Sequence, residues 1–346
     1  EQAYELNQKR ANRILGGMLW MKMSKNAVQN AIDLSDVVSA EISEQEDAFV
    51  IGAMTVLRTL ETHEGLNRYT DGAVRESLRH IVGVQFRNSA TIGGSVYGRF
   101  GFSDVLTMLL ALDVRVELYK GGIIPLETYA EMPYDTDIIV NIIIRKTPMK
   151  TAYLSSRNSK SDFPVSACAV SFRENERRVV IGARPQKAMI IRADDEVMKL
   201  ADGDPEKFSD ALAAQVQKEV KTSGNMRASA EYRRHLAKIL AKRASMQILK
   251  EGGTAERGNS PGSCEPGHAS FGFCEKTWMR KCKKGMRDSK LWALYSYDRR
   301  KADIVLFYAG GQSCRETCCN TGGDSGRGKG VRGIPGGSGC GSVWLL

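Results

Sequence analysis

Short apolar runs alternate with helical patterns over residues 1–147. Apolar runs that predict strands occur at 13–15, 31–34, 48–52, 114–119 and 138–144. Helical patterns occur over 1–12, 55–66, 73–81 and after Ser103, whose hydroxyl suits an N-cap. The small residues between 87 and 98 predict a loop. This mixture predicts an α+β region with short strands.

A second pattern begins near residue 150. Two apolar runs, 166–173 and 178–182, flank a polar turn and predict a hairpin. Helical patterns follow over 194–201, 205–221 and 229–248. In the last of these, one side carries Leu236, Ile239, Leu240 and Ile248, and the other carries Arg233, Arg234 and Lys238.

Composition places these regions in an ordinary globular protein. The chain has 346 residues, 42% hydrophobic and 26% charged, which suggests two domains and excludes overall disorder. It lacks an apolar run of the ~18 residues that a membrane span needs, and Glu1 opens a polar stretch unlike a signal peptide. We therefore expect a cytoplasmic protein, and a first residue other than Met suggests a fragment or processed product.

The net charge of +10 is unevenly distributed. Residues 1–250 have 35 basic and 31 acidic residues (35 − 31 = +4), and 251–346 have 15 and 9 (15 − 9 = +6). No aromatic residues are interleaved with a basic stripe, so nucleic-acid binding is not expected.

Residues 251–346 differ in kind from what precedes them. They hold seven of the eight cysteines, without C-x-x-C spacing, and no coherent apolar period. A metal site is therefore not expected, and a disulfide scaffold would require export. We expect this tail to be disordered or translated in a non-native frame.

Two glycine pairs are candidate phosphate-binding loops. One lies in Ile14-Leu15-Gly16-Gly17, and the other in Thr91-Ile92-Gly93-Gly94-Ser95. Glycine lets backbone N–H groups approach an anion closely, and the Thr91 and Ser95 hydroxyls could donate further bonds. Neither loop has the G-x-G-x-x-G or G-x-x-x-x-G-K-S/T pattern, so taken alone each glycine pair is more simply explained as a turn.

Three segments resemble one family in the order expected for it. The run 85–95, with Ser103-Asp104 after it, resembles R-N-x-A-T-x-G-G-N followed by S-D, and Leu15-Gly16-Gly17 resembles the start of an A-G-G-T loop. The run 223–236 resembles the end of the family's C-terminal domain. The chain is thereby similar to the flavin-binding subunit of molybdenum hydroxylases, the group of xanthine dehydrogenase and aerobic carbon monoxide dehydrogenase.

The resemblance implies an α+β fold with two domains. Residues 1–147 would form a two-part FAD-binding domain of the vanillyl-alcohol oxidase (PCMH) type. Residues 148–250 would form a small C-terminal domain whose sheet packs on helices. The FAD diphosphate would lie between the two glycine loops. The implied cofactor-binding residues are Ile14, Leu15, Gly16, Gly17, Met18, Leu19, Thr91, Ile92, Gly93, Gly94, Ser95, Asp104, Ile138 and Tyr153.

Within that set, three residues have particular implied places. Asp104 would face the ribityl or diphosphate region, Ile138 would lean on the flavin, and Tyr153 would neighbour its ring. Met18 and Leu19 stand where the family usually has a second glycine and a threonine. The loss of one charge-assisted hydrogen bond to phosphate would cost about 1.5–3 kcal/mol. The family's usual N-terminal strand is also missing.

The implied function is electron transfer without acid–base residues of its own. FAD would take electrons from a [2Fe–2S] small subunit and reduce NAD+ or another acceptor. Substrate would be hydroxylated on a separate molybdenum-cofactor large subunit, as in a xanthine dehydrogenase-like oxidoreductase. A scaffold subunit that has lost flavin, or a stand-alone flavin oxidoreductase of the same fold, are the alternatives.

Several other residues are expected to be structural. His63 and His80 read as solvated or capping histidines, and Cys168 reads as a small buried hydrophobe. The Arg157, Lys160 and Asp162 cluster reads as a solvated ion group, and Arg233-Arg234 as the polar face of the last helix.

Overall fold

The computed structural model describes residues 1–25, 27–201, 203–254, 291–298, 301–308 and 313–317. The chain divides after residue 260 into two units. Within the described ranges, no helix combines the length and the apolar character that crossing a membrane requires.

The chain begins with a small parallel pair of strands. Helix α1 (Gln2–Asn7) precedes β1 (Asn12–Leu15), which pairs with β2 (Asn30–Asp33), and the 3-10 turn η1 (Met21–Met23) lies between them. The helix is shorter than the expected 1–12, because Asn12 already belongs to β1. This pair places the first glycine loop directly after β1.

A five-stranded antiparallel sheet follows, in the order β3-β4-β7-β5-β6. Alternate residues of β5 are buried, as expected for a strand whose one face packs on a core. The strands are β3 (Ile42–Glu44), β4 (Ala48–Gly52), β5 (Val114–Leu118), β6 (Gly122–Pro125) and β7 (Ile139–Arg145).

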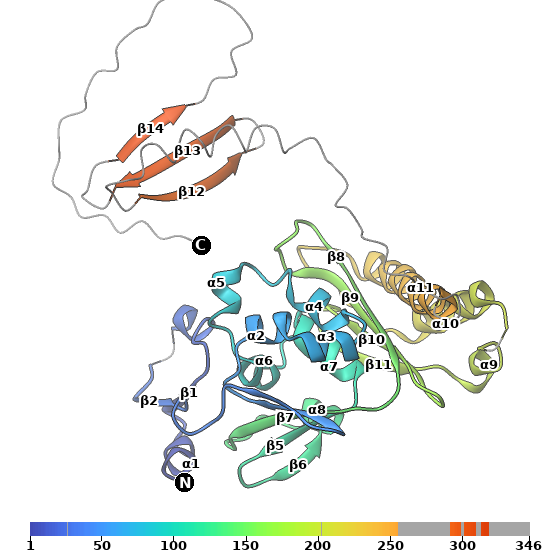
Figure 1. Cartoon of the computed structure of the whole chain (residues 1–346), viewed down its shortest axis with the longest axis horizontal. Helices are drawn as coiled ribbons and strands as arrows, with labels where there is room; N and C mark the ends of the chain where they lie inside the picture. Colours follow the sequence, from blue (N-terminus) through green and yellow to red (C-terminus); the bar gives the residue numbers. More distant parts are fainter. Residues whose placement is uncertain (26, 202, 255–290, 299–300, 309–312, 318–346) are drawn as a thin grey trace, which may run out of the picture. The chain divides into compact units, whose positions relative to one another are not determined.

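Short helices connect these strands, and some of them pack against the sheet (Figure 1). They are α2 (Leu57–Thr62), α3 (Glu64–Tyr69), α4 (Ala73–Leu78), α5 (Val84–Arg87), α6 (Ile92–Gly98), α7 (Asp104–Ala111) and α8 (Leu126–Glu131). The helix expected over 55–66 is broken at His63, whose Nδ1 accepts the Leu66 N–H at 3.0 Å, so His63 is a cap as expected. The loop expected over 87–98 is wrong, since α6 occupies most of it.

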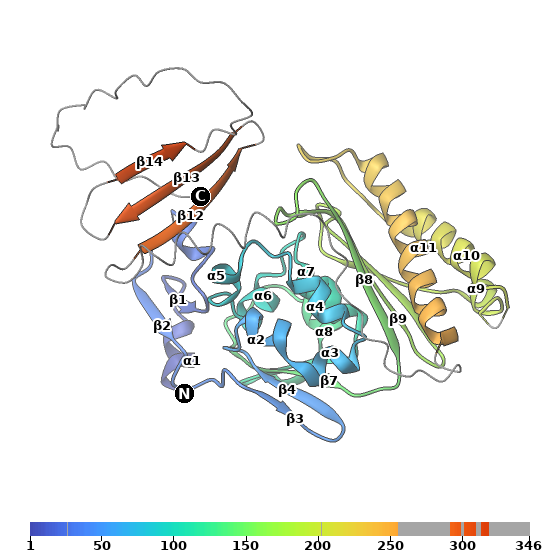
Figure 2. The ribbon, with the colours of Figure 1, turned by 45° about the horizontal axis from the view of Figure 1, so that its top comes forward.

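The second sheet has the order β11-β10-β9-β8 and is covered on both faces. Figures 1 and 2 show α4 and α7 on one face and α10 and α11 on the other. Every residue of β9 is buried as a result, including Cys168, and burial raises the pKa of that thiol. The expected hairpin is β9–β10. The elements are β8 (Lys150–Arg157), β9 (Pro164–Phe172), β10 (Arg177–Gly182), β11 (Met189–Arg192), α9 (Asp195–Met198), α10 (Pro205–Glu219) and α11 (Ala230–Thr254).

The second sheet holds the C-terminal end of α7. The Ser171 hydroxyl donates to the Ala111 carbonyl at 2.6 Å, and Arg178 donates to the Leu110 carbonyl at 3.1 Å. These bonds satisfy carbonyls that a helix end leaves without partners. The α+β architecture with a sheet packed on helices is confirmed.

The buried face of α11 includes a charged residue that the sequence pattern assigns to solvent. Arg233 is fully buried, and its guanidinium donates to the carbonyls of Val165, Ser223 and Ala228 and to the Asn225 side chain at 2.7–2.9 Å. Placing Arg233 on the polar face is therefore wrong, because four acceptors replace its hydration. Its neighbour Arg234 is exposed, as expected.

The second unit contains an antiparallel sheet in the order β12-β13-β14. Its strands are β12 (Leu291–Asp298), β13 (Lys301–Tyr308) and β14 (Ser313–Thr317). These strands and the end of α11 lie within 251–346, the segment expected to be disordered or translated in a non-native frame. The rest of the predicted tail, with six of its cysteines, lies outside the described residues.

Candidate functional site

The two glycine loops lie against each other. A Cβ on Gly16 would come 2.9 Å from the Thr91 hydroxyl oxygen, and a Cβ on Gly17 would come 2.0 Å from the Ser89 carbonyl oxygen. Contacts below 3.0 Å require atoms to shift, so glycine is needed for this close approach. The structure thus brings together the loops that the sequence singled out.

The second loop is the beginning of α6, and its N–H groups already have acceptors. Ile92 donates to the Thr55 carbonyl and Gly93 to the Ala53 carbonyl, both at 2.9 Å. The Thr91 hydroxyl caps the helix by accepting the Gly94 N–H at 3.2 Å. The Ser95 hydroxyl, expected to be an extra phosphate donor, instead donates to the Thr91 carbonyl at 2.9 Å.

The first loop differs from the second in its backbone hydrogen bonding. Among the described residues, no acceptor is found for the backbone N–H groups of Gly17, Met18 and Leu19. Met18 has φ +59°, in the left-handed region that favours glycine, and its carbonyl accepts the Lys22 N–H at 3.0 Å. Successive N–H groups around a left-handed residue form an anion-binding concavity. Ile14 and Leu15, half-buried in β1, lead into this loop.

Asp104 lies at the start of α7, capped by Ser103 as predicted, but its carboxylate is buried among protein partners. Arg157 donates to it at 2.6 Å, and the Tyr153 hydroxyl donates to it as well. Burial raises the pKa of Asp104, while Arg157 and Tyr153 oppose that rise. The description of Arg157 as a solvated group is therefore wrong, because its guanidinium is enclosed with the carboxylate.

Tyr153 and Ile138 are both in the interior. Tyr153 is 2% exposed, and burial, followed by the Asp104 charge, raises its pKa well above the usual value. Ile138 precedes β7, is 6% exposed, and accepts the Tyr119 N–H through its carbonyl. Within the described part of the chain, the hydrogen bonds of these two residues join neither of them to a glycine loop.

An aromatic cluster beside the first loop was missed by the sequence reasoning. Trp20 lies 5.4 Å from Phe100, 5.4 Å from Phe102 and 5.9 Å from Phe163 between ring centroids. We call Trp20, Phe100, Phe102 and Phe163 the aromatic cluster. The signal available in the sequence was weak: Trp20 precedes all other tryptophans by more than 250 residues and lies three positions after Gly17.

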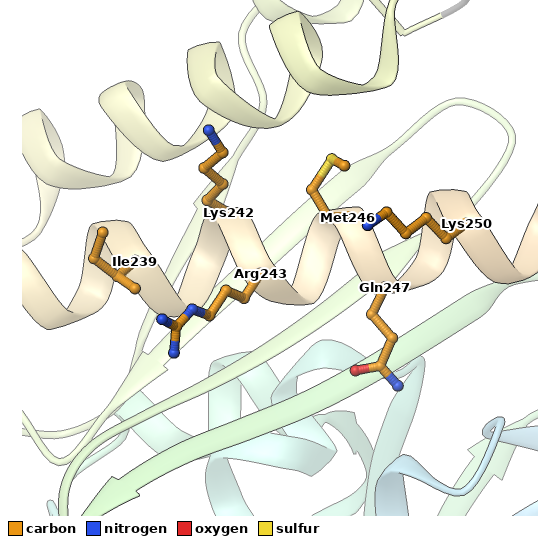
Figure 3. Close-up of a pocket in the computed structure, with 6 residues that line it drawn as sticks. All are labelled: Ile239, Lys242, Arg243, Met246, Gln247 and Lys250. Atoms are coloured by element: carbon orange, nitrogen blue, oxygen red, sulfur yellow. The ribbon is translucent and has the colours of Figure 1, made fainter.

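The remaining candidates are structural. Burial lowers the pKa of His80, whose Nε2 lies 3.4 Å from the Glu76 Oε1. An open groove lies on α11, distant in sequence from the glycine loops, and three cationic and three other side chains line it. Figure 3 shows that Lys242 in this groove points toward α10. There its Nζ pairs with the Asp210 carboxylate at 2.6 Å. No cluster of three or more metal-ligating side chains occurs in the part of the chain that the structure describes.

Two family models match this chain in tandem. Residues 1–147 match the FAD-binding domain in molybdopterin dehydrogenase, and residues 151–248 match the CO dehydrogenase flavoprotein C-terminal domain. Among curated proteins, the uncharacterized protein YgfM of Escherichia coli strain K12 is 26% identical over 245 residues, covering 69% of this chain and 90% of that protein.

Solved structures share the fold. A carbon monoxide dehydrogenase from Hydrogenophaga pseudoflava, which lacks the Mo-pyranopterin moiety of its cofactor, matches with a TM-score of 0.64 and 19% identity, covering 72% of this chain and 94% of that chain. Quinoline 2-oxidoreductase from Pseudomonas putida 86 matches with a TM-score of 0.63 and 16% identity over the same shares.

Fold and family models together define an oxidoreductase subunit of the flavoprotein class. The chain belongs to the family of FAD-binding subunits of molybdenum hydroxylases, and its cofactor is FAD. The first loop fits this cofactor, because the N–H groups of Gly17, Met18 and Leu19, which have no acceptor among the described residues, are suited to a diphosphate, and the glycine pair permits the close contact with the second loop.

Proposed function

We propose that this chain is the electron-transfer subunit of a molybdenum hydroxylase complex. A large subunit with the molybdenum cofactor would oxidise the substrate, and a small subunit would carry [2Fe–2S] clusters. Bound FAD supplies the exchange between one-electron clusters and a two-electron acceptor, for which we propose NAD+. The similarity to a CO dehydrogenase and a quinoline oxidoreductase supports such a complex.

The observation that carries this proposal is the contact between the two glycine loops. The N–H groups of Gly17, Met18 and Leu19 would hold the diphosphate. Thr91, at the start of α6, would pack against the first loop and keep it in place. Ile14, Leu15, Ile92, Gly93, Gly94 and Ser95 would shape the two walls. Asp104 would contribute by holding the Arg157 guanidinium in place, and Ile138 and Tyr153 would pack in the core beside the flavin. None of these residues needs to transfer a proton.

The test is to purify the full chain with its two partner subunits and record the visible spectrum. Flavin bands, and their loss on anaerobic addition of NADH, are expected. A colourless complex after incubation with excess FAD would favour the scaffold alternative and contradict the proposal. Bound flavin without co-purifying partners would favour a stand-alone flavin oxidoreductase.

Four further proposals complete this assignment. The domain border lies between residues 147 and 148, the complex is of the xanthine dehydrogenase type, and it works in the cytoplasm. The native reading frame ends near Gly252. Sequencing the locus tests the last of these: an intact frame through Leu346 would contradict it.

A further inference from the structure

Exposed aromatic surface lies immediately beyond the first glycine loop. Trp20 is 40% exposed, although three phenylalanines pack around it, and those three are only half-buried. The rings of Phe100 and Phe102 stack with an interplanar angle of 4°, and the ring centroids of Phe163 and Phe102 are 4.5 Å apart. Four rings gathered at a solvent-facing position mark a surface that a ligand or partner covers.

Hydrogen bonds and ion pairs hold the Phe163 side of the aromatic cluster in place. Arg157, paired with buried Asp104, also donates to the Asp162 carbonyl at 2.7 Å, and the Asp162 carboxylate accepts the N–H of Phe163 at 2.7 Å. The Arg227 guanidinium lies 5.2 Å from the Phe163 ring centroid and pairs with Asp162 at 3.3 Å. This network fixes one wall of the cluster, and a fixed wall favours stacking because little freedom is lost on binding.

The position of Trp20 relates this surface to the donors of the first loop. It follows Leu19 directly, and its carbonyl accepts the Met23 N–H at 3.1 Å, which closes the turn. A molecule whose phosphate binds the N–H groups of Gly17 to Leu19 would place an attached ring within reach of the indole. The aromatic cluster draws on both domains, since Trp20, Phe100 and Phe102 lie within residues 1–147 and Phe163 lies in the loop between β8 and β9.

We propose that Trp20 is the stacking platform for the isoalloxazine ring of FAD, with the three phenylalanines supporting it. This inference rests on the proposed function. The isoalloxazine system has three fused rings, so it covers more of a four-ring surface than adenine does. Tyr153, the ring neighbour implied by the family resemblance, is too deeply buried to stack on a ligand.

The experiment measures the affinity of the full chain for two halves of FAD. FMN carries isoalloxazine and one phosphate, whereas ADP carries adenine and a diphosphate. Trp20→Ala is expected to raise the Kd of FMN roughly tenfold, which is the size of one aromatic stacking contact, and to leave the Kd of ADP within about twofold. Trp20→Phe keeps a ring face and should stay within about threefold of the wild type. Tyr232→Ala, which removes an exposed ring on α11, is the matched control.

A spectroscopic arm works even where Trp20→Ala fails to fold. Trp278, Trp292 and Trp344 are the other tryptophans of the chain, and replacing all three by Phe leaves Trp20 as the single emitter. FMN is expected to quench that emission and ADP is not.

Four outcomes would overturn the inference. Equal FMN affinities with no quenching would remove the platform, and a larger loss for ADP would assign the cluster to adenine. Unchanged nucleotide affinity with lost co-purification of the partner subunits would make the cluster a protein-docking surface. A wild-type chain that binds neither FAD nor FMN would overturn the proposed function as well.

Discussion

The two glycine loops are close in space but opposite in their hydrogen bonding. In the second loop, the N–H groups of Ile92, Gly93 and Gly94 all donate within the protein. In the first, three consecutive N–H groups have no acceptor among the described residues, and Met18 adopts a left-handed conformation. A binding site can therefore divide its tasks: one loop is fixed in the core, and the other offers its donors to the ligand.

The stem of the second loop provides the largest test of this division. Arg87, at the end of α5, is buried and donates to Glu61 at 2.7 Å. Glu61→Gln leaves the guanidinium without its counter-charge, so we expect the free energy of unfolding to fall by about 3 kcal/mol in urea titrations. Glu64→Gln, at an exposed position nearby, should change it by less than ~0.5 kcal/mol. Equal effects would show that the second loop is not anchored by this pair.

The contact between the loops is tested by adding single methyl groups. Gly17→Ala drives a Cβ into the Ser89 carbonyl, whereas Gly94→Ala meets only the Thr91 hydroxyl at 3.0 Å. We expect Gly17→Ala to lower the free energy of unfolding by about 2 kcal/mol and to abolish FAD retention on gel filtration. Gly94→Ala, at an exposed position of α6, should change stability by less than ~1 kcal/mol. The reverse order would contradict the assigned packing.

The pH dependence of stability gives a smaller and more specific signal. Burial acts to raise the pKa of Glu61, but hydrogen bonds and charges of Arg87 and Arg58 outweigh it and hold the pKa below its usual 4.5. A carboxylate with a lowered folded-state pKa stabilises the protein above its unfolded pKa, and that stability is lost as the pH falls through the folded value.

The stability difference between the wild type and Glu61→Gln should consequently be constant from pH 7 to about 5 and shrink below about 4.5. Urea titrations at four pH values would measure it. A difference that persists unchanged at pH 3.5 would mean that the carboxylate charge contributes nothing.

Sequence reasoning succeeded where a pattern is local. Apolar runs located β4, β5 and the β9–β10 hairpin, and the sequence also singled out the two glycine pairs that the fold brings into contact. It failed at α6, because two glycines lower helix propensity while the Thr91 cap and core packing override it. It also failed at Arg157 and Arg233, whose burial depends on acceptors from distant segments that no local pattern reveals.

The smallest effect is expected from the conformation of Met18 itself. A non-glycine residue in the left-handed region is strained by about 1–2 kcal/mol, and glycine gives back part of that gain through its greater freedom in the unfolded chain. Met18→Gly should therefore raise the free energy of unfolding by about 0.5–1 kcal/mol and leave the FAD Kd within about twofold, because the N–H directions are kept. Leu19→Gly is the matched control: Leu19 packs on the core without a positive φ, so the same replacement should destabilise by about 1 kcal/mol. If both variants lose stability alike, Met18 stores no strain.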